Sequence, residues 1–193
     1  MTKKKAVFLD RDGVVNRKLP EGHYVTRWDE LEILPGVPEA ITLLNQAGYL
    51  VFIATNQRGV AKGLMSLDVL EEIHRRLTAE LASRGAVITQ IYSCPHDSLP
   101  PCRCRKPAPG MLLDAAEAHN LDLGDSWMIG DSPRDIQAGH NAGCRTIRLA
   151  HQSASVANPS ASILQTHSAT VPEPVPDLSA ANLLDAVQQL LSH

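Results

Sequence analysis

Two aspartates separated by a single residue follow directly after a short apolar segment near the start of the chain. Residues 6–9 (Ala-Val-Phe-Leu) have the unbroken hydrophobic character of a buried strand, and Asp10 and Asp12 come immediately after it. Gly13 then allows the backbone to turn sharply. Taken alone, the pair could mark only a strand end and a turn. At the carboxyl end of a parallel strand, where open α/β sheets bind ligands, it could instead hold a divalent cation or supply a nucleophile and an acid/base.

Strand and helix patterns alternate along the chain, which predicts an α/β fold. The expected strands span residues 6–9, 49–54, 87–92, 126–129 and 145–149, and the expected helices span 37–47, 66–85, 109–119, 133–143 and 180–191. This order predicts a Rossmann-like three-layer sandwich, in which a mainly parallel sheet is covered by helices on both faces. Residues 150–179 are rich in Ser, Ala and Pro and are expected to form a loop, with a short edge strand near 169–171. No insertion is long enough for a separate cap domain.

The composition is that of an ordinary soluble protein and predicts one domain, residues 1–193. Hydrophobic residues make up 44% of the chain, charged residues 20%, and the net charge is −3. With 4% aromatic residues and no basic excess, a nucleic-acid partner is not expected. The absence of an apolar run of 18 residues argues against a membrane span, so a cytoplasmic protein is expected. We also expect a monomer.

Polar residues follow three of the expected strands and should meet at one edge of the sheet. Thr55, Asn56 and Gln57 follow the second strand, and Asp131 follows the fourth. Strand carboxyl ends share one edge of a parallel sheet, so these residues should lie beside the first two aspartates. Carboxylate oxygens with open water positions suit Mg²⁺, and the predicted ligands are Asp10, Asp12 and Asp131. A nearby lysine, Lys106, and the Thr55 hydroxyl make this arrangement suited to phosphoryl transfer.

A second group of metal-ligand residues lies between residues 94 and 104. It supplies three thiolates and one imidazole, from Cys94, His96, Cys102 and Cys104. This closed set predicts a structural Zn²⁺ site in a short loop, with no position left for a substrate. Cys144 lies outside the group and is expected to be a small buried hydrophobic residue. The loop leads directly into Arg105 and Lys106. Zinc would therefore fix the backbone that directs these two cationic side chains toward the predicted phosphoryl-transfer site.

At these motifs the chain resembles the phosphatases of the haloacid dehalogenase superfamily. The segments DRDG, TNQ, the Lys before Pro107 and GDSPRD match its four motifs, and the resemblance covers residues 6–150. It implies that Asp10 attacks phosphorus to form an aspartyl-phosphate and that Asp12 acts as general acid and then as base. It also implies that Mg²⁺ is held by Asp10, the backbone carbonyl of Asp12 and Asp131, with Asp135 in support. The phosphoryl group would be held by Thr55 and Lys106.

The CPH…CxCRKP pattern resembles a zinc-bearing branch of this superfamily that acts on small phosphorylated metabolites. TNQRGVAKG and CRKPAPGMLL are similar to the segments of branch members that act on a sugar bisphosphate. This resemblance implies hydrolysis of the C7 phosphate of D-glycero-D-manno-heptose 1,7-bisphosphate, in precursor synthesis for lipopolysaccharide or related glycans. The alternatives are histidinol phosphate, a broader range of phosphoesters, or a phosphosugar-binding protein without catalysis. The resemblance implies that Arg105 recognises the C1 phosphate. The full set of predicted substrate contacts is Arg11, Tyr24, Asn56, Gln57, Arg58, Arg105 and Lys106. One departure from the pattern is Ser132, where well-known relatives carry Lys.

Overall fold

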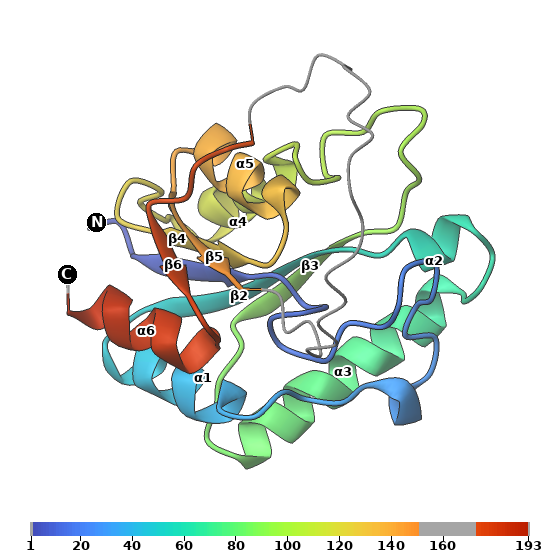
Figure 1. Ribbon diagram of the computed structural model, residues 1–193, viewed down its shortest axis with the longest axis horizontal. Coiled ribbons are helices and arrows are strands. Elements are labelled where there is room, and N and C mark those ends of the chain that lie inside the picture. Colours follow the sequence, from blue (N-terminus) through green and yellow to red (C-terminus); the bar gives the residue numbers. More distant parts are fainter. Residues whose placement is uncertain (1, 151–172, 193) are drawn as a thin grey trace, which may run out of the picture.

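The computed structural model describes residues 2–150 and 173–192, and its centre is a six-stranded sheet (Figure 1). The strands are β1 (Ala6–Leu9), β2 (Leu50–Asn56), β3 (Gln90–Cys94), β4 (Trp127–Gly130), β5 (Arg145–Leu149) and β6 (Leu178–Ala180). Their order is β3-β2-β1-β4-β5-β6, and every neighbouring pair is parallel. The chain crosses from one side of β1 to the other between β3 and β4. Such a switch point opens a crevice at the strand carboxyl ends.

Helices cover both faces of this sheet (Figure 1). They are α1 (Val37–Gln46), α2 (Arg58–Ala61), α3 (Leu67–Ser83), α4 (Gly110–His119), α5 (Pro133–Ala142) and α6 (Leu183–Leu191), with a 3-10 turn η1 (Trp28–Glu30). The buried apolar residues of α1 and α6 belong to one core cluster with Leu77 and Leu81 of α3, and those of α4 belong to another with Ala142 of α5. Leu70 and Ile73 of α3 lie in a third, smaller cluster. The three-layer arrangement predicted from the sequence is therefore confirmed, and every strand named among the described residues belongs to this single sheet.

The central strands bury both faces, which explains their continuous apolar sequences. Along β1, Val7 and Leu9 belong to the core beneath α1 and α6, whereas Ala6 and Phe8 belong to the core beneath α4. Phe8 stacks on Phe52 of β2 with ring centroids 5.3 Å apart. Successive side chains of a strand point to opposite faces, so a strand between two helical layers has no polar side. The first polar side chains appear where the strands end, at the edge that carries the site.

Two of the central strand boundaries differ from the prediction. β2 continues through Thr55 and Asn56, which pair with Ser93 and Cys94 of β3. β3 begins at Gln90, and Val87, predicted to start it, is 57% exposed. The side chain of Asn45 binds both the backbone N–H and the carbonyl of Val87. These groups are therefore unavailable to a strand ladder, and the strand starts later.

The end of the chain also differs from the prediction. The edge strand expected near residues 169–171 lies outside the described residues. A strand does form at β6, which spans the end of the predicted loop and the first residue of the predicted helix, and α6 begins at Leu183, three residues later than expected. Asp177 accepts hydrogen bonds from the N–H and the hydroxyl of Thr146, at 2.7 and 2.9 Å. This contact aligns the returning chain beside β5. The short helix α2 and the turn η1 were not predicted.

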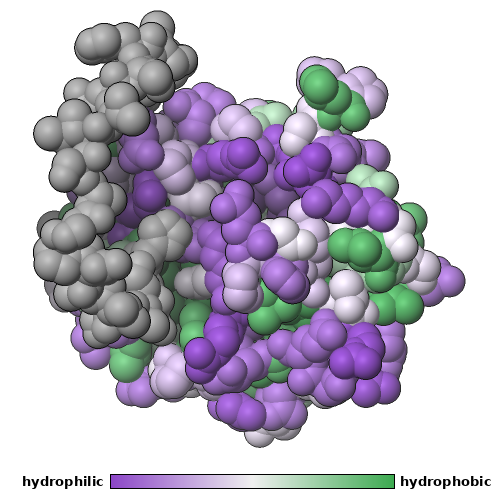
Figure 2. All heavy atoms as spheres, turned by 45° about the vertical axis from the view of Figure 1, so that its right-hand side comes forward, coloured by the Kyte–Doolittle hydropathy of each residue, from purple (hydrophilic) through white to green (hydrophobic). Residues whose placement is uncertain are grey.

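No helix within residues 2–150 and 173–192 combines the length and the apolar character needed to cross a membrane. The face in Figure 2 carries mostly hydrophilic residues, with hydrophobic residues scattered among them. Single exposed apolar side chains of this kind are normal on protein surfaces.

Candidate active site and metal centre

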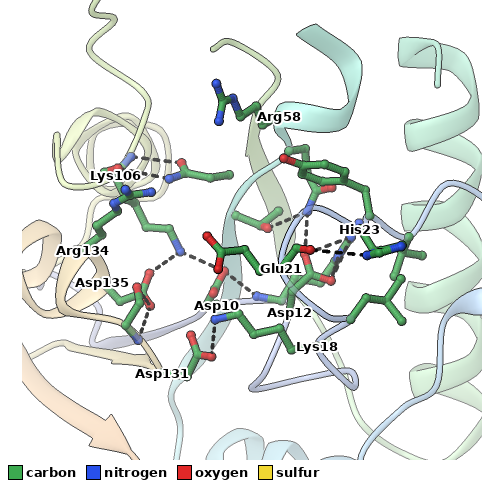
Figure 3. A pocket seen from close by; sticks show the side chains of 18 of the residues that line it. Asp10, Asp12, Lys18, Glu21, His23, Arg58, Lys106, Asp131, Arg134 and Asp135 are labelled. Atoms are coloured by element: carbon green, nitrogen blue, oxygen red, sulfur yellow. Dashed lines mark hydrogen bonds and ion pairs between the residues drawn. The ribbon is translucent and has the colours of Figure 1, made fainter. Parts of the chain in front are cut away.

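The predicted site residues converge on one pocket of about 590 Å³ at the carboxyl ends of the central strands (Figure 3). Residues 18–25 form part of its wall, and the first turn of α5 forms another part. The convergence follows from topology, because β1, β2 and β4 are parallel neighbours and end at the same edge. The predicted residues that line it are Asp10, Arg11, Asp12, Tyr24, Thr55, Asn56, Gln57, Arg58, Arg105, Lys106 and Asp131.

Lys106 provides the buried positive charge at the centre of the site. Its ammonium lies 2.8 Å from Asp10 Oδ1, 2.6 Å from Asp135 Oδ1 and 2.7 Å from the carbonyl oxygen of Ala54, and its side chain is 2% exposed. Burial alone would lower the pKa of Lys106, but the charges of Asp10 and Asp135 outweigh it and raise the pKa. Burial raises the pKa of Asp10 to about 7, against the opposing charge of Lys106. The two groups thus form a desolvated ion pair.

The backbone around Lys106 is fixed by a side chain from β2. Asn56 Nδ2 donates to the carbonyl oxygen of Lys106 at 3.1 Å, and the N–H of Lys106 donates to Asn56 Oδ1 at 3.0 Å. This pair of bonds ties together segments fifty residues apart in the sequence. Asn56 was predicted to contact substrate. In the structure, both the oxygen and the nitrogen of its side-chain amide instead bind the backbone of Lys106 and hold it in position.

Three carboxylates lie close together in the pocket, and two of them contact the ammonium of Lys106. Oxygens of Asp10, Asp131 and Asp135 all lie within 4.8 Å of one another. Their approach requires glycine at two positions. A Cβ on Gly13, which has φ +100°, would lie 2.4 Å from Asp131 Oδ2, and a Cβ on Gly130 would lie 2.1 Å from Asp135 Cβ. A close set of carboxylate oxygens is the donor chemistry that a hard divalent cation requires.

Asp12 directs its carboxylate away from this cluster. Oδ1 accepts hydrogen bonds from Arg11 Nη2 and Asn16 Nδ2, both at 3.0 Å, and Oδ2 accepts from Arg11 Nη2 and Gln57 Nε2, also at 3.0 Å. Burial alone would raise the pKa of Asp12, but the charge of Arg11 and these hydrogen bonds lower it. Gln57 Nε2 also donates to the Thr55 hydroxyl at 2.8 Å, which links Thr55 to the same network. Because both carboxylate oxygens of Asp12 are engaged by these donors, its backbone carbonyl is the group that could contribute to a metal site.

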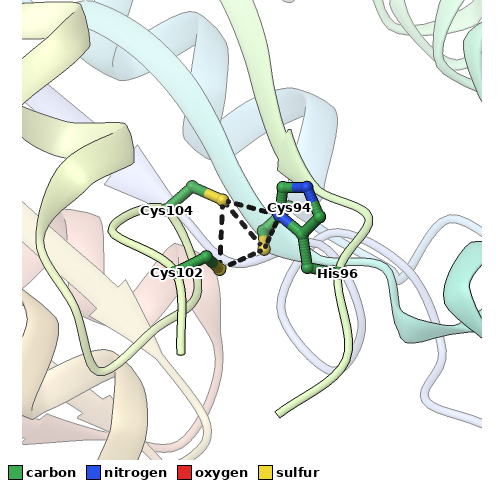
Figure 4. Close-up of side chains that lie close together, drawn as sticks. All are labelled: Cys94, His96, Cys102 and Cys104. Carbon is green, nitrogen blue, oxygen red and sulfur yellow. Dashed lines mark hydrogen bonds between the residues drawn. The ribbon is translucent and has the colours of Figure 1, made fainter. Parts of the chain in front are cut away.

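The Cys/His group forms a compact cluster beside the pocket (Figure 4). Cys104 Sγ lies 3.0 Å from Cys94 Sγ, 3.4 Å from Cys102 Sγ and 3.2 Å from His96 Nδ1. All three cysteines are free thiols, and the four candidate ligand atoms lie within 4.8 Å of one another. This arrangement could bind a metal ion. Arg105 Nη1 donates to the carbonyl oxygen of His96 at 3.0 Å, so the cluster is connected directly to a pocket residue.

Arg58 also connects the pocket to the Cys/His segment. Its Nε lies 2.6 Å from Asp97 Oδ1, and its Nη2 lies 3.1 Å from Asp97 Oδ2. This two-point ion pair turns the guanidinium toward the residue that follows His96. A direct contact between Arg58 and substrate, as predicted from the sequence, would have to compete with this ion pair.

Three charged or polar residues that line or adjoin the pocket were not predicted from the sequence. Lys18 lies 2.6 Å from Asp131 Oδ2, Arg134 lines the pocket from the first turn of α5, and Asn16 binds Asp12. Arg134 follows directly on the GDSP segment, so its place in a known motif was a usable signal. Lys18 and Asn16 lie in an irregular loop, where spacing gives no indication of side-chain direction. At Ser132, the hydroxyl donates to Asp135 at 2.6 Å and caps α5.

Comparison with known proteins identifies the family. The model of haloacid dehalogenase-like hydrolases matches residues 2–143, and a second model of HAD-like hydrolases matches residues 103–184. A protein of Bordetella bronchiseptica named D-glycero-beta-D-manno-heptose-1,7-bisphosphate 7-phosphatase is 44% identical over 140 residues, covering 72% of this chain and 77% of the relative. A Rhodopseudomonas palustris protein of the same name is 43% identical over 154 residues, covering 76% of this chain and 84% of the relative.

A solved structure extends the similarity to the whole fold. The crystal structure of D,D-heptose 1,7-bisphosphate phosphatase from B. bronchiseptica, complexed with magnesium and phosphate, superposes with a TM-score of 0.79. It is 35% identical in sequence, and the match covers 97% of this chain and 98% of that chain. The superfamily resemblance predicted from the four motifs is therefore confirmed: the chain belongs to the haloacid dehalogenase-like hydrolase family.

Proposed function

We propose that this hydrolase is a Mg²⁺-dependent phosphatase that removes the C7 phosphate of D-glycero-D-manno-heptose 1,7-bisphosphate. The observation that carries the proposal is the juxtaposition of Asp10, the Lys106 ammonium and two further carboxylates in one pocket. A carboxylate nucleophile, a fixed cation and a metal-binding oxygen set are the groups that phosphoryl transfer needs. The relatives named above supply the choice of sugar.

The proposed reaction has two steps that use the same pair of aspartates. An oxygen of Asp10 bonds to phosphorus while the bond from phosphorus to the sugar oxygen breaks, and Asp12 gives that oxygen a proton. Water then attacks the aspartyl-phosphate, its proton passes to Asp12, and inorganic phosphate leaves as the carboxylate of Asp10 is restored. The lowered pKa of Asp12 in the free protein suits the base role. A phosphoryl dianion bound nearby would favour the protonated form.

Other side chains would stabilise the transferring group without changing covalent state. Lys106 and the Thr55 hydroxyl would donate to phosphoryl oxygens. Asp10 and Asp131, with the backbone carbonyl of Asp12 and with Asp135 in support, would hold Mg²⁺, which neutralises charge on the phosphoryl oxygens when bound. Cys94, His96, Cys102 and Cys104 would hold a structural Zn²⁺, since three thiolates and an imidazole fill a tetrahedral site. We place the enzyme as a cytoplasmic, single-domain monomer in the synthesis of heptose precursors for lipopolysaccharide or related glycans.

The cations around the pocket suit a substrate with a second phosphate. Lys106 and Lys18 form ion pairs with the carboxylate cluster, whereas, within residues 2–150 and 173–192, Arg105 and Arg134 line the pocket without an ion pair to Asp10, Asp131 or Asp135. Among the described residues, Arg134 has no hydrogen-bonding or ion-pair partner, and Figure 3 shows its side chain at the edge of the pocket. We therefore assign the C1 phosphate to Arg105 and Arg134. Loop residues such as Tyr24 would shape the sugar site.

The test of the proposed substrate is a comparison of kcat/KM for heptose 1,7-bisphosphate and histidinol phosphate with Mg²⁺ present. We expect a preference of at least about 100-fold for the bisphosphate, because the contacts with Arg105 and Arg134 are both lost and each charge-assisted contact costs about 1.5–3 kcal/mol. A preference for histidinol phosphate would overturn the substrate and leave the mechanism in place. Absence of phosphate release from any small phosphoester would overturn the phosphatase function itself.

Arg134→Gln is expected to lower kcat/KM for heptose 1,7-bisphosphate by about tenfold or more, because the C1 phosphate loses a charged donor. Hydrolysis of heptose 7-phosphate, which lacks that group, should change by less than about twofold. Steady-state kinetics with both substrates checks this expectation. The matched control is Arg58→Gln, since the Arg58 guanidinium is engaged by Asp97. Equal losses on both substrates for Arg134→Gln would remove this residue from the C1 site.

A further inference from the structure

The largest fully buried side chain of the described protein is a charged one, that of Arg11. It is 0% exposed, although it stands between the two aspartates of the proposed mechanism. A guanidinium cannot lose its proton in a protein, so burial demands a partner for each part of the group. The partners identify what this residue does.

One side of the Arg11 guanidinium faces Asp12. Nη2 donates to both carboxylate oxygens at 3.0 Å, and Nε lies 3.3 Å from Oδ1. This two-point contact fixes the plane of the carboxylate relative to the plane of the guanidinium, in a way that a single bond could not. Asp12 therefore takes its orientation from Arg11, with further bonds from Asn16 and Gln57.

The other side of the guanidinium faces His74, on the buried side of α3. Arg11 Nη1 lies 3.2 Å from His74 Nε2, and His74 is 9% exposed. Arginine only donates hydrogen bonds, so Nε2 must be the acceptor and the proton of the neutral ring must lie on Nδ1. Burial, with a contribution from the charge of Arg11, lowers the pKa of His74 to about 3. The ring is therefore a permanent acceptor under ordinary conditions.

These contacts form a continuous line from α3 to the proposed acid/base. We propose that His74 is a positioning residue, which fixes the guanidinium of Arg11 and through it the carboxylate of Asp12 at the place where protons are exchanged. The inference rests on the proposed phosphatase function, since it assigns a purpose to the geometry of Asp12. It also gives Arg11 a positioning role in place of the substrate contact predicted from the sequence.

If His74 positions Asp12, its loss should affect substrates differently according to how much their leaving group needs a proton. A sugar alkoxide needs a proton as it departs, whereas p-nitrophenolate departs as a stable anion and needs almost none. Because kcat/KM reports on the steps up to phosphoryl transfer, misplacing Asp12 should be visible in that constant for the sugar phosphate. We expect His74→Leu to lower kcat/KM for heptose 1,7-bisphosphate by about tenfold or more, with less than about threefold change for p-nitrophenyl phosphate.

Two variants separate positioning from loss of structure. His74→Gln keeps an acceptor oxygen for Arg11 and should recover most of the activity on the sugar substrate. Leu77→Ala, one turn further along α3 and fully buried, weakens the same helix without touching Arg11 and should affect both substrates equally. Melting curves for all three variants would show that the comparison is made on folded protein.

A double-variant measurement provides a second, independent readout. In an Asp12→Asn background, His74→Leu should cause no further loss of kcat/KM on heptose 1,7-bisphosphate, because the group that it positions is absent. A full additional loss in that background, or equal losses on both leaving groups in the single variant, would overturn the role of His74. Failure of the wild-type protein to hydrolyse either phosphoester would instead overturn the proposed function, so the two failures are distinguishable.

Discussion

Replacing Asp10 with Asn is expected to reduce turnover of heptose 1,7-bisphosphate by roughly 10⁴-fold or more, because the amide cannot attack phosphorus. The fold should survive, since Asn is the same size and Asp135 continues to neutralise Lys106. Steady-state kinetics measures the loss. Rapid quenching of the wild-type reaction should trap phosphate on the protein, and the same quench of Asp10→Asn should trap none.

The control for this variant is Asp29→Asn, an exposed aspartate of η1 that does not line the pocket. It removes the same charge from the chain and should leave kinetics unchanged. Full activity of Asp10→Asn, or a phosphorylated residue elsewhere in the chain, would remove Asp10 as the nucleophile. The carboxylate cluster would then be left with a metal-binding role alone.

Replacing Cys102 with Ser is expected to lower zinc content, stability and activity together. Loss of one thiolate opens a closed four-ligand site, and we expect the free energy of unfolding to fall by at least about 2 kcal/mol. For a chain of this length that corresponds to a melting temperature lower by about 4 °C or more. Activity should fall because Arg105 is bonded to the carbonyl of His96 and lies next to Lys106. Metal analysis, calorimetry and kinetics on one preparation would measure all three.

Cys144→Ala is the matched control for the zinc experiment. Cys144 is buried in the core, and it lies outside the Cys/His cluster. Its replacement leaves a small cavity and should lower stability slightly while zinc content stays constant. If Cys102→Ser retained zinc and melted like the wild-type protein, the structural-zinc proposal would be wrong. If zinc were lost while activity stayed unchanged, the cluster would not be needed to position Arg105 and Lys106.

Much of the site could be predicted because topology determines it. Unbroken apolar strands followed by Asp10, by Thr55 and by Asp131 are enough to place these residues at one sheet edge, since parallel strands end together. The Cys/His cluster was equally predictable, because the spacing of its ligands admits few other uses. Both predictions depend only on residue type and strand order.

The remaining contacts depend on side-chain direction, which sequence spacing does not determine. The burial of Arg11 against His74 joins two segments 63 residues apart through an irregular loop and the face of a helix. The late start of β3 results from one amide, Asn45, binding both backbone groups of Val87. β6 depends on Asp177 docking on Thr146. In each case long-range hydrogen bonds decide an arrangement that the local sequence pattern does not determine.

Asp135 serves two purposes with one carboxylate. Oδ2 accepts from the N–H and the hydroxyl of Ser132 and so closes the first turn of α5, while Oδ1 binds Lys106. Asparagine could still cap the helix but would leave the lysine with half of its negative surroundings, and a longer glutamate would displace both contacts. Neither replacement keeps both contacts of Asp135. Ser132 contacts Asp135 only as a cap, so its replacement should leave the ion pair between Asp135 and Lys106 in place.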